Sequence, residues 1–400
     1  MTTVPMTSPD RAGTSLSRAL FLVHTHRAAL RSDLTEGLGL TRTATGLVLR
    51  ELETLSLVRT VTAPRADPWV PTTGRPSHAI EIHPDAPTVL AVQVQARSVL
   101  VTLARLGGKL GPVDEVPLPE TATPEAVLGL IADLLCTRFA TPGRPPFGVG
   151  LALPSAVGSD GTALAAHHLA WPHAVPVHRL LSGLLDRSGF GEVRLHVGND
   201  ANLAALAESR HGAGQGAAQL LYVMTGQVGV GGGLVIDGRL HLGSAGYALE
   251  IGHTPVRQGK RPCRCGNRGC LEVEADPMAL LDAAGLSTTY PTPDAVRAII
   301  GRRHVDARAR AAVDLVTRQL AGGLASLINI LNPDRIVLGG MHAELLAAEE
   351  ERLRSVISRH SFLDQDAHIE LRAAALDASA LAGAAELALQ PLLDDPRLLV

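Results

Sequence analysis

Residues 250–272 read EIGHTPVRQGKRPCRCGNRGCLE, a glycine-rich segment in which three cysteines fall within eight positions. One imidazole and three thiolates form a common closed tetrahedral set for zinc, and soft sulfur ligands favour zinc over magnesium or calcium. Free cysteines in a loop are the alternative, but their crowding favours metal. We therefore predict a structural Zn²⁺ held by four ligands: His253, Cys263, Cys265 and Cys270.

The composition around this stretch is that of a folded protein with two or three units. The chain has 400 residues, of which 46% are apolar and 19% charged, so it is too apolar for a disordered protein. Four cysteines are too few for a disulfide framework. Residues 1–13 do not have the pattern of a signal peptide, and no run of 18 apolar residues occurs. We expect a soluble, cytoplasmic protein.

The first part of the chain has the pattern of three short helices. We expect them at residues 16–30, 32–38 and 41–53. Ser32 and Thr41 are placed to cap the second and third helices, and Gly39 supplies the turn between them. Two helices joined by such a turn form a helix-turn-helix. A small helical interaction domain with the same topology is the alternative.

A helix-turn-helix reads DNA with the exposed positions early in its last helix. Here these candidates are Arg42, Thr43 and Gly46, with Arg50 placed to reach phosphate. The segments 59–62 and 78–82 alternate as two strands of a hairpin, or wing, and Arg75 lies where its tip would enter a minor groove. Residues 1–83 carry nine Arg against seven acidic residues, which permits DNA binding. We predict that residues 1–83 form a DNA-binding domain that folds alone.

Strands alternating with helices follow from residue 88, which indicates an α/β core. The polar run Asn199-Asp200-Ala201-Asn202 comes directly after a strand. A carboxylate at the carboxyl end of a strand is well placed for a ligand in the sheet crevice, where Asp200 could act as a general base. A helix cap at Asp200 is an equally sufficient explanation.

A glycine-rich segment follows between two expected strands in residues 223–238. Clustered glycines let backbone N–H groups approach phosphate. A glycine-rich hairpin without a ligand is equally consistent with the residues. The glycines concerned are Gly226, Gly229, Gly231, Gly232 and Gly233.

Taken in order, these motifs resemble the ROK family (repressors, uncharacterised reading frames and sugar kinases), and most closely its transcription regulators. The resemblance also includes Gly74-Arg75-Pro76 and Leu331-Asn332-Pro333 with Gly339-Gly340. It implies a winged helix-turn-helix followed by a two-lobed, actin-like α/β domain over residues 88–400. The first lobe would span about 88–200 plus a C-terminal helix near 378–389, and the second about 201–375.

The resemblance further implies a sugar between the lobes. Carried over by position, its ligands would be Asn199, Asp200, Glu250, His253 and Glu272. In this arrangement His253 binds zinc with one ring nitrogen and orients toward the sugar with the other. Three departures on the sugar side are Leu249 and Ser155, each in place of a family glycine, and His168 in place of an asparagine.

The two ATP-binding elements of family kinases depart further from the pattern. The first should read Asp-x-Gly-x-Thr, but Gln93 and Gln95 stand at the Asp and Gly positions. The second lacks its first glycine and its hydroxyl residue, replaced by Gln227 and Val228. A glutamine side chain at a glycine position crowds phosphate. We therefore predict no ATP binding and no enzyme activity, with Asp200 as a vestigial base position.

The leading hypothesis is a sugar-responsive transcriptional regulator of the repressor type that binds an operator in double-stranded DNA as a homodimer or homotetramer. Its effector would be a small sugar or sugar phosphate. An active ATP-dependent sugar kinase with a DNA-binding head is the first alternative. A regulator that has lost its sugar is the second.

Overall fold

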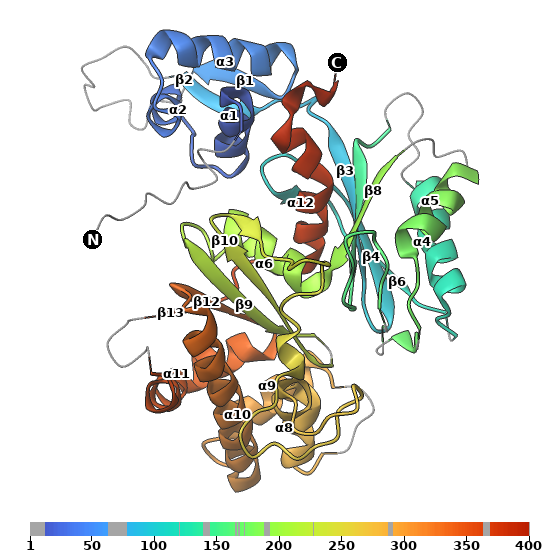
Figure 1. Cartoon of the computed structure of the whole chain (residues 1–400), viewed down its shortest axis with the longest axis vertical. Coiled ribbons are helices and arrows are strands. Elements are labelled where there is room, and N and C mark those ends of the chain that lie inside the picture. The colour runs from blue at the N-terminus through green and yellow to red at the C-terminus, as the bar shows by residue number, and fades with distance from the viewer. Residues whose placement is uncertain are drawn as a thin grey trace.

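The computed structural model describes most of the chain in a head and two lobes (Figure 1). The described residues are 13–62, 78–119, 121–138, 145–164, 166, 169–171, 173–187, 193–226, 228–286, 291–362 and 369–399. Five residues named from the sequence lie outside these ranges: Gly74, Arg75, Pro76, His168 and Gln227. No helix among the described residues is long and apolar enough to cross a membrane.

The head contains three helices followed by a two-stranded antiparallel sheet. Its elements are α1 (Ser15–His24), α2 (Arg31–Leu38), α3 (Arg42–Thr54), β1 (Val58–Thr62) and β2 (His78–Ile82). Thr41 caps α3 by accepting a hydrogen bond from the backbone N–H of Ala44, and Gly39 ends α2 with φ of 65°. The cap predicted at Ser32 is wrong, because α2 already begins at Arg31. Helix α1 is shorter than expected, because the chain turns at His26 with φ of 59°.

The first lobe is built on a six-stranded sheet. The central strands run in the order β5-β4-β3-β7-β8, and β6 pairs with β4. The elements are β3 (Thr88–Val94), β4 (Ser98–Arg105), β5 (Lys109–Leu110), β6 (Asp114–Pro117), α4 (Pro124–Arg138), β7 (Gly148–Leu153), α5 (Val177–Arg187) and β8 (Arg194–Asn199). Helices α4 and α5 lie together on one face of this sheet (Figure 1).

The second lobe has a five-stranded sheet in the order β11-β10-β9-β12-β13. Its strands are β9 (Gln219–Thr225), β10 (Val230–Ile236), β11 (Arg239–Leu240), β12 (Arg335–Gly339) and β13 (Glu370–Ala373). Its helical elements are η3 (Ile251–His253), α7 (Leu271–Glu274), α8 (Pro277–Ala283), α9 (Pro293–Arg302), α10 (Ala307–Leu331) and α11 (Met341–His360). Each predicted lobe thus contains one sheet.

Two helices lie between the lobes and set how closely they approach. Helix α6 (Asp200–His211) packs on β9 and β10, whereas α12 (Ser379–Asp394) packs on β3 and β7. The two helices touch through backbone, because a Cβ atom at Gly383 would lie 1.9 Å from the carbonyl oxygen of Leu203. The C-terminal helix predicted near 378–389 is therefore present, longer than expected, and packs on the first lobe; a short turn, η4 (Pro396–Leu399), follows it.

The core of the head continues into the first lobe. Buried residues of α1 and α3, such as Leu20 and Leu52, belong to the same apolar cluster as Leu389 of α12 and Val89 of β3. The expectation that the head folds alone must therefore be revised. We expect an isolated head to be less stable than the head in the full chain, because removing α12 exposes this shared core to water.

Candidate functional site: a cleft between the lobes beside a histidine–cysteine cluster

A cleft of about 860 Å³ opens between the two lobes. It is bordered by the end of β3, the start of α6, the turn between β9 and β10, and the start of α12. All five predicted sugar ligands line this one cleft: Asn199, Asp200, Glu250, His253 and Glu272. The fold thus brings together side chains that are up to 73 residues apart in the sequence, from positions 199 to 272.

Asn199 and Asp200 are placed in the cleft by the start of α6. The side-chain oxygen of Asn199 accepts the backbone N–H of Asn202 at 2.9 Å, and its amide donates to the carbonyl of Ser155 at 3.1 Å. Asn199 is therefore the helix cap, which leaves Asp200 as the first residue of the helix. The cap alternative for Asp200 is wrong by one residue, and within the helix end its carboxylate accepts the backbone N–H of its neighbour Ala201 at 2.8 Å.

Glu250 follows a strained residue. Leu249, which stands at a family glycine position, has φ of 69°, a left-handed conformation that costs on the order of 1 kcal/mol for a residue with a side chain. Solvent reaches Glu250 through the cleft, yet burial by the surrounding protein raises the pKa of its carboxyl group, against an opposing effect of His253. The departure at Leu249 therefore leaves the backbone turn in place.

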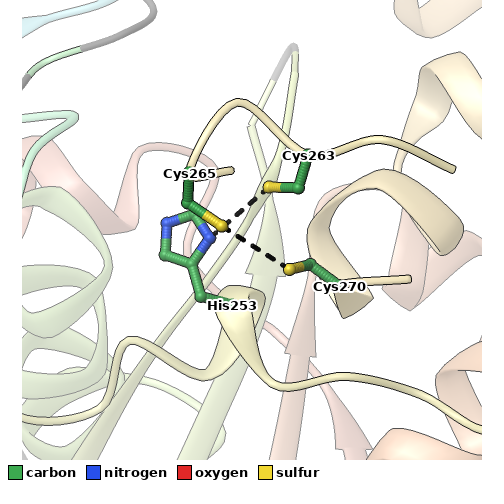
Figure 2. A group of neighbouring side chains, drawn as sticks. All are labelled: His253, Cys263, Cys265 and Cys270. Carbon is green, nitrogen blue, oxygen red and sulfur yellow. Dashed lines mark hydrogen bonds between the residues drawn. The ribbon is translucent and has the colours of Figure 1, made fainter. Parts of the chain in front are cut away.

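The four predicted metal ligands converge beside the cleft (Figure 2). Their ligand atoms all lie within 4.8 Å of one another. The Nδ1 atom of His253 is 3.7 Å from Sγ of Cys263, and Sγ of Cys265 is 3.7 Å from Sγ of Cys270. Tetrahedral zinc with bonds of about 2.3 Å to sulfur separates its ligand sulfurs by about 3.8 Å. Both separations therefore fit ligands of one tetrahedral ion.

A carboxylate completes the surroundings of the cluster. The Oε2 atom of Glu272 lies 3.3 Å from Nδ1 of His253 and 3.4 Å from Sγ of Cys263. Burial raises the pKa of Cys263 and of Cys270, whereas a backbone hydrogen bond from Asn267 lowers the pKa of Cys265. A cation at the centre would stabilise the thiolates and attract Glu272, so the donor chemistry also fits a metal ion.

Residues 89–391 match the model of the ROK family. The chain belongs to the ROK family. The xylose repressor of Caldicellulosiruptor bescii is 26% identical over 340 residues, which cover 81% of this chain and 83% of the repressor. The glucokinase of Halalkalibacterium halodurans is 30% identical over 271 residues, which cover 63% of this chain and 79% of that enzyme.

The ROK fold extends over the head as well. The crystal structure of a ROK family transcriptional regulator, a homologue of the E. coli MLC protein, aligns with a TM-score of 0.74 and 22% identity, covering 95% of this chain and 96% of that one. The family membership and the fold class predicted from the sequence are therefore confirmed. Transcription regulators and kinases both occur among the relatives, so the family alone does not separate the two activities.

The glycines of the ROK domain's β9–β10 region serve packing. A Cβ atom at Gly231 would lie 2.8 Å from Cβ of Ala201, and one at Gly233 would lie 2.7 Å from Cβ of Ala205. These glycines lie within β10 and not in a loop between strands, and they let α6 approach the sheet. The sequence left two interpretations open, a phosphate-binding loop and a hairpin without a ligand. The packing of Gly231 and Gly233 is explained by the hairpin alone.

The turn that precedes β10 donates a backbone hydrogen bond to a buried acid, Asp276, which was not predicted from the sequence. Oδ2 of Asp276 accepts the backbone N–H of Gly229 at 3.3 Å, and its Oδ1 accepts that of Ala279 at 2.8 Å. Burial raises the pKa of Asp276. Its position at the N-terminus of α8, before Pro277, was the available signal, since Asp is a preferred cap there.

The head presents a polar face on α3, with one exception to the prediction. The exposed side chains of this helix include Arg42, Thr43, Leu47 and Arg50. Gly46, predicted to be exposed, is buried, because a Cβ atom there would lie 2.5 Å from Nη2 of Arg31. Arg31 crosses from α2 and donates to the carbonyl of Arg42 at 3.0 Å. Arg31 therefore covers the position at which we had expected a DNA contact.

Proposed function

We propose that this ROK protein is a sugar-responsive, DNA-binding transcriptional repressor. The observation that carries the proposal is the union, in one chain, of a helix-turn-helix head with a cleft in which five polar side chains gather. Carboxylates, an amide and an imidazole suit bidentate hydrogen bonding to vicinal hydroxyls of a sugar. The proposed effector is a small sugar or sugar phosphate bound by Asn199, Asp200, Glu250, His253 and Glu272.

The metal ion would hold part of this sugar site in place. We propose that His253, Cys263, Cys265 and Cys270 bind one Zn²⁺ whose task is structural, since four protein ligands leave no open position for water. The Nδ1 atom of His253 faces the cysteines and its other ring nitrogen points away from them (Figure 2). That second nitrogen is then available to the cleft, with its tautomer fixed by the metal.

DNA recognition would use the exposed side of α3. We propose contacts from Arg42 and Thr43 to base edges, from Arg50 to phosphate, and from the wing residue Arg75 to a minor groove. Leu47 is 58% exposed on the same helix and would suit the methyl group of a thymine. Two heads reading a symmetric operator require at least a homodimer, and a homotetramer is also compatible. Such a regulator would act in the cytoplasm.

Kinase activity is the competing function, and two local features argue against it. The side chains of Gln93 and Gln95 border the cleft where the first phosphate element of a kinase would lie. The backbone N–H of Gly229, which a phosphate loop would offer to ATP, is already bonded to the carboxylate of Asp276. A negative charge behind that N–H disfavours phosphate. We propose that the chain does not use ATP, and that Asp200 accepts a sugar hydroxyl.

The function is tested with the purified full chain, D-xylose, D-glucose, N-acetyl-D-glucosamine, and an operator selected from random double-stranded DNA. We expect one sugar to raise the melting temperature and to weaken operator binding at least tenfold, about 1.4 kcal/mol. Asp200→Ala should abolish both sugar effects and keep operator binding. Asp186→Ala, which removes an exposed carboxylate on α5, serves as the control. Operator binding that ignores every sugar would support a ligand-independent regulator instead.

Separate measurements test the proposed DNA contact of Arg50 and the proposed lack of ATP use. Arg50→Ala should weaken operator binding and reduce the salt slope by about one, whereas Arg187→Ala on α5 should change neither. Incubation with ATP and each sugar should yield no ADP above that of Asp200→Ala. Sugar-dependent ADP formation that requires Asp200 would establish the kinase alternative.

A further inference from the structure

A buried carboxylate on α12, that of Glu386, joins three parts of the chain. Nε2 of His24, on α1 of the head, lies 2.8 Å from its Oε2 atom. Nη1 of Arg210 and Nε2 of His211, at the end of α6, lie 2.8 and 3.0 Å from the same carboxylate. The four side chains are between 0% and 8% exposed. We call this group the Glu386 junction: His24, Arg210, His211 and Glu386.

The contact of the second ring nitrogen of His24, Nδ1, determines which of its two nitrogens carries the hydrogen. Nδ1 accepts the backbone N–H of Gly107, in the β4–β5 turn, at 2.9 Å. Because Nδ1 accepts this hydrogen bond it carries no hydrogen, so the ring is neutral and its single hydrogen is on Nε2, which donates to Glu386. Burial also lowers the pKa of His24. A metal ion would need the Nε2 lone pair that this hydrogen occupies. Although His24, His211 and Glu386 are close enough to hold a metal, they form a hydrogen-bonded junction.

Burial alone would raise the pKa of Glu386, but its interactions with His24 and His211, which include a hydrogen bond from each, outweigh it and hold the pKa well below its usual range. The carboxylate is therefore ionised, and Arg210 supplies a permanent positive charge beside it. A carboxylate has room for these three donors. Every donor that reaches it comes from an element other than α12, so its pairing depends on how α1, α6 and α12 lie relative to one another.

Helix α6 connects this junction to the cleft. It begins at Asp200 in the cleft, ends at His211 in the junction, and spans about 18 Å at 1.5 Å per residue over its 12 residues. All residues from Ala201 to Arg210 are buried. Gly233 of β10 and Gly383 of α12 hold the helix from two sides by backbone contact. Packing this close leaves no room for bending, so α6 moves as one piece.

We propose that Glu386 is the positioning residue through which α6 transmits sugar binding at Asp200 to the DNA-reading head. Helix α6 packs on the second-lobe sheet and α12 on the first-lobe sheet, so closure of the cleft turns one helix against the other. This rotation moves Arg210 and His211 relative to the carboxylate that also holds His24. Because an unpaired buried charge or donor is costly, His24 stays paired with Glu386 during this rotation, and α1 of the head moves with it. The inference rests on the proposed sugar response and names the residues that carry it from the cleft to the head.

The test compares Glu386→Gln with a matched variant, Glu208→Gln. Glu208 is also fully buried on α6, but its carboxylate accepts backbone N–H groups of Ala213, Ala375 and Leu376 and the hydroxyl of Ser379, none of them in the head. Operator affinity is measured with and without whichever of D-xylose, D-glucose and N-acetyl-D-glucosamine stabilises the wild type. We expect Glu386→Gln to bind that sugar within threefold of wild type, while the sugar effect on operator affinity falls from at least tenfold to below twofold. Glu208→Gln should keep that effect.

A second measurement needs no sugar. Amide hydrogen exchange in α1 should become at least tenfold faster in Glu386→Gln than in wild type or Glu208→Gln, because the head loses its anchor. His24→Phe, which keeps the Glu386–Arg210 pair, should behave like Glu386→Gln and replaces it if that variant does not fold.

A full sugar response in Glu386→Gln and His24→Phe would overturn the inference and leave the sugar-responsive function standing. Unchanged exchange in α1 of both variants would also overturn it. A wild-type chain whose operator binding ignores all three sugars would refute the proposed function, and the transmission with it, whatever the exchange in α1 shows.

Discussion

The histidine–cysteine cluster (His253, Cys263, Cys265 and Cys270) and the Glu386 junction both place histidine next to a carboxylate, yet they differ in what each ring nitrogen faces. Nδ1 of His253 faces two kinds of electron-rich atom, the sulfur of Cys263 and the carboxylate of Glu272. In the junction, Nδ1 of His24 faces an N–H donor and Nε2 faces a carboxylate that Arg210 already neutralises. The histidine–cysteine cluster contains no arginine or lysine, whereas the Glu386 junction contains the guanidinium group of Arg210.

Residue types and closeness therefore do not decide whether a cluster holds a metal. Both groups bring ligand atoms within 4.8 Å of one another. The balance of protons and charge separates them, because a metal ion needs lone pairs, whereas the carboxylate of the junction already accepts hydrogens from His24, Arg210 and His211. Four predictions test this distinction.

The largest effect is expected from Cys265→Ser. Zinc should fall from one ion per chain to less than a tenth, measured by mass spectrometry of metals. Structural zinc contributes on the order of 10 kcal/mol in zinc-finger peptides. Losing even about 4 kcal/mol here would lower the melting temperature by roughly 8–16 °C. Cys136→Ser, at the cysteine outside the cluster, should keep the metal. An unchanged metal content in Cys265→Ser would contradict the ligand assignment.

Glu386→Ala should destabilise the protein by about 3–5 kcal/mol without loss of metal. The substitution leaves Arg210 as a buried charge whose carboxylate partner is gone, in a site where the two side chains are 5% and 1% exposed. Unfolding in urea gives the free energy, and metal analysis gives the zinc content. A loss below about 1 kcal/mol, or a loss of zinc, would show that the junction is not the separate, charge-balanced unit described here.

A third buried histidine, His342, has no carboxylate partner among the residues that the structure describes, and its burial predicts a stability that falls in acid. Burial lowers its pKa from an ordinary value near 6.5 to about 4. Because the folded-state pKa is the lower one, the unfolded chain binds more protons between these values. Its contribution is present above about pH 6.5 and is lost as pH falls toward 4, by about 3 kcal/mol in total.

Urea unfolding at several pH values between 7 and 4 measures this slope. His342→Gln, whose amide can still donate to the carbonyl of Ala275, should remove most of it. A slope that persists in His342→Gln would assign the acid sensitivity to other groups, such as those of the Glu386 junction.

The smallest effect is expected from His211→Gln. The amide can still donate to Oε1 of Glu386, which Nε2 of His211 now reaches at 3.0 Å, so only a weakened hydrogen bond is expected. A loss of about 1 kcal/mol follows, with metal content unchanged. A loss as large as that of Glu386→Ala would mean that His211, and not Arg210, balances the buried carboxylate.

The parts of the fold that the sequence predicts well depend on neighbours in the chain. The cap at Thr41, the turn at Gly39 and the metal loop around Cys263 each involve residues only a few positions apart. Helix caps and metal ligands at short spacing follow from local geometry, so one sequence is enough to place them.

The parts that it misses depend on distant partners. Nothing near Gly46 in the sequence indicates that Arg31 covers it, and the left-handed turn at Leu249 is hidden by its side chain. His24 and Glu386 are 362 residues apart and belong to no motif. The one local signal was Glu386 itself, an acid surrounded by alanine and leucine in the middle of the helix, where an unpaired charge has no favourable place.

Because the head and α12 share a core, the head can complete its core only after α12 has been synthesised. A ribosome adds about 5–20 residues per second, so Glu386 is made roughly 20–70 s after His24, given their separation of 362 residues. During that interval Leu20 and Leu52 lack the partners on α12 with which they share a core. The newly made head therefore presents apolar surface to chaperones until the chain reaches its last helix, and its core is complete only together with the domain on which it packs.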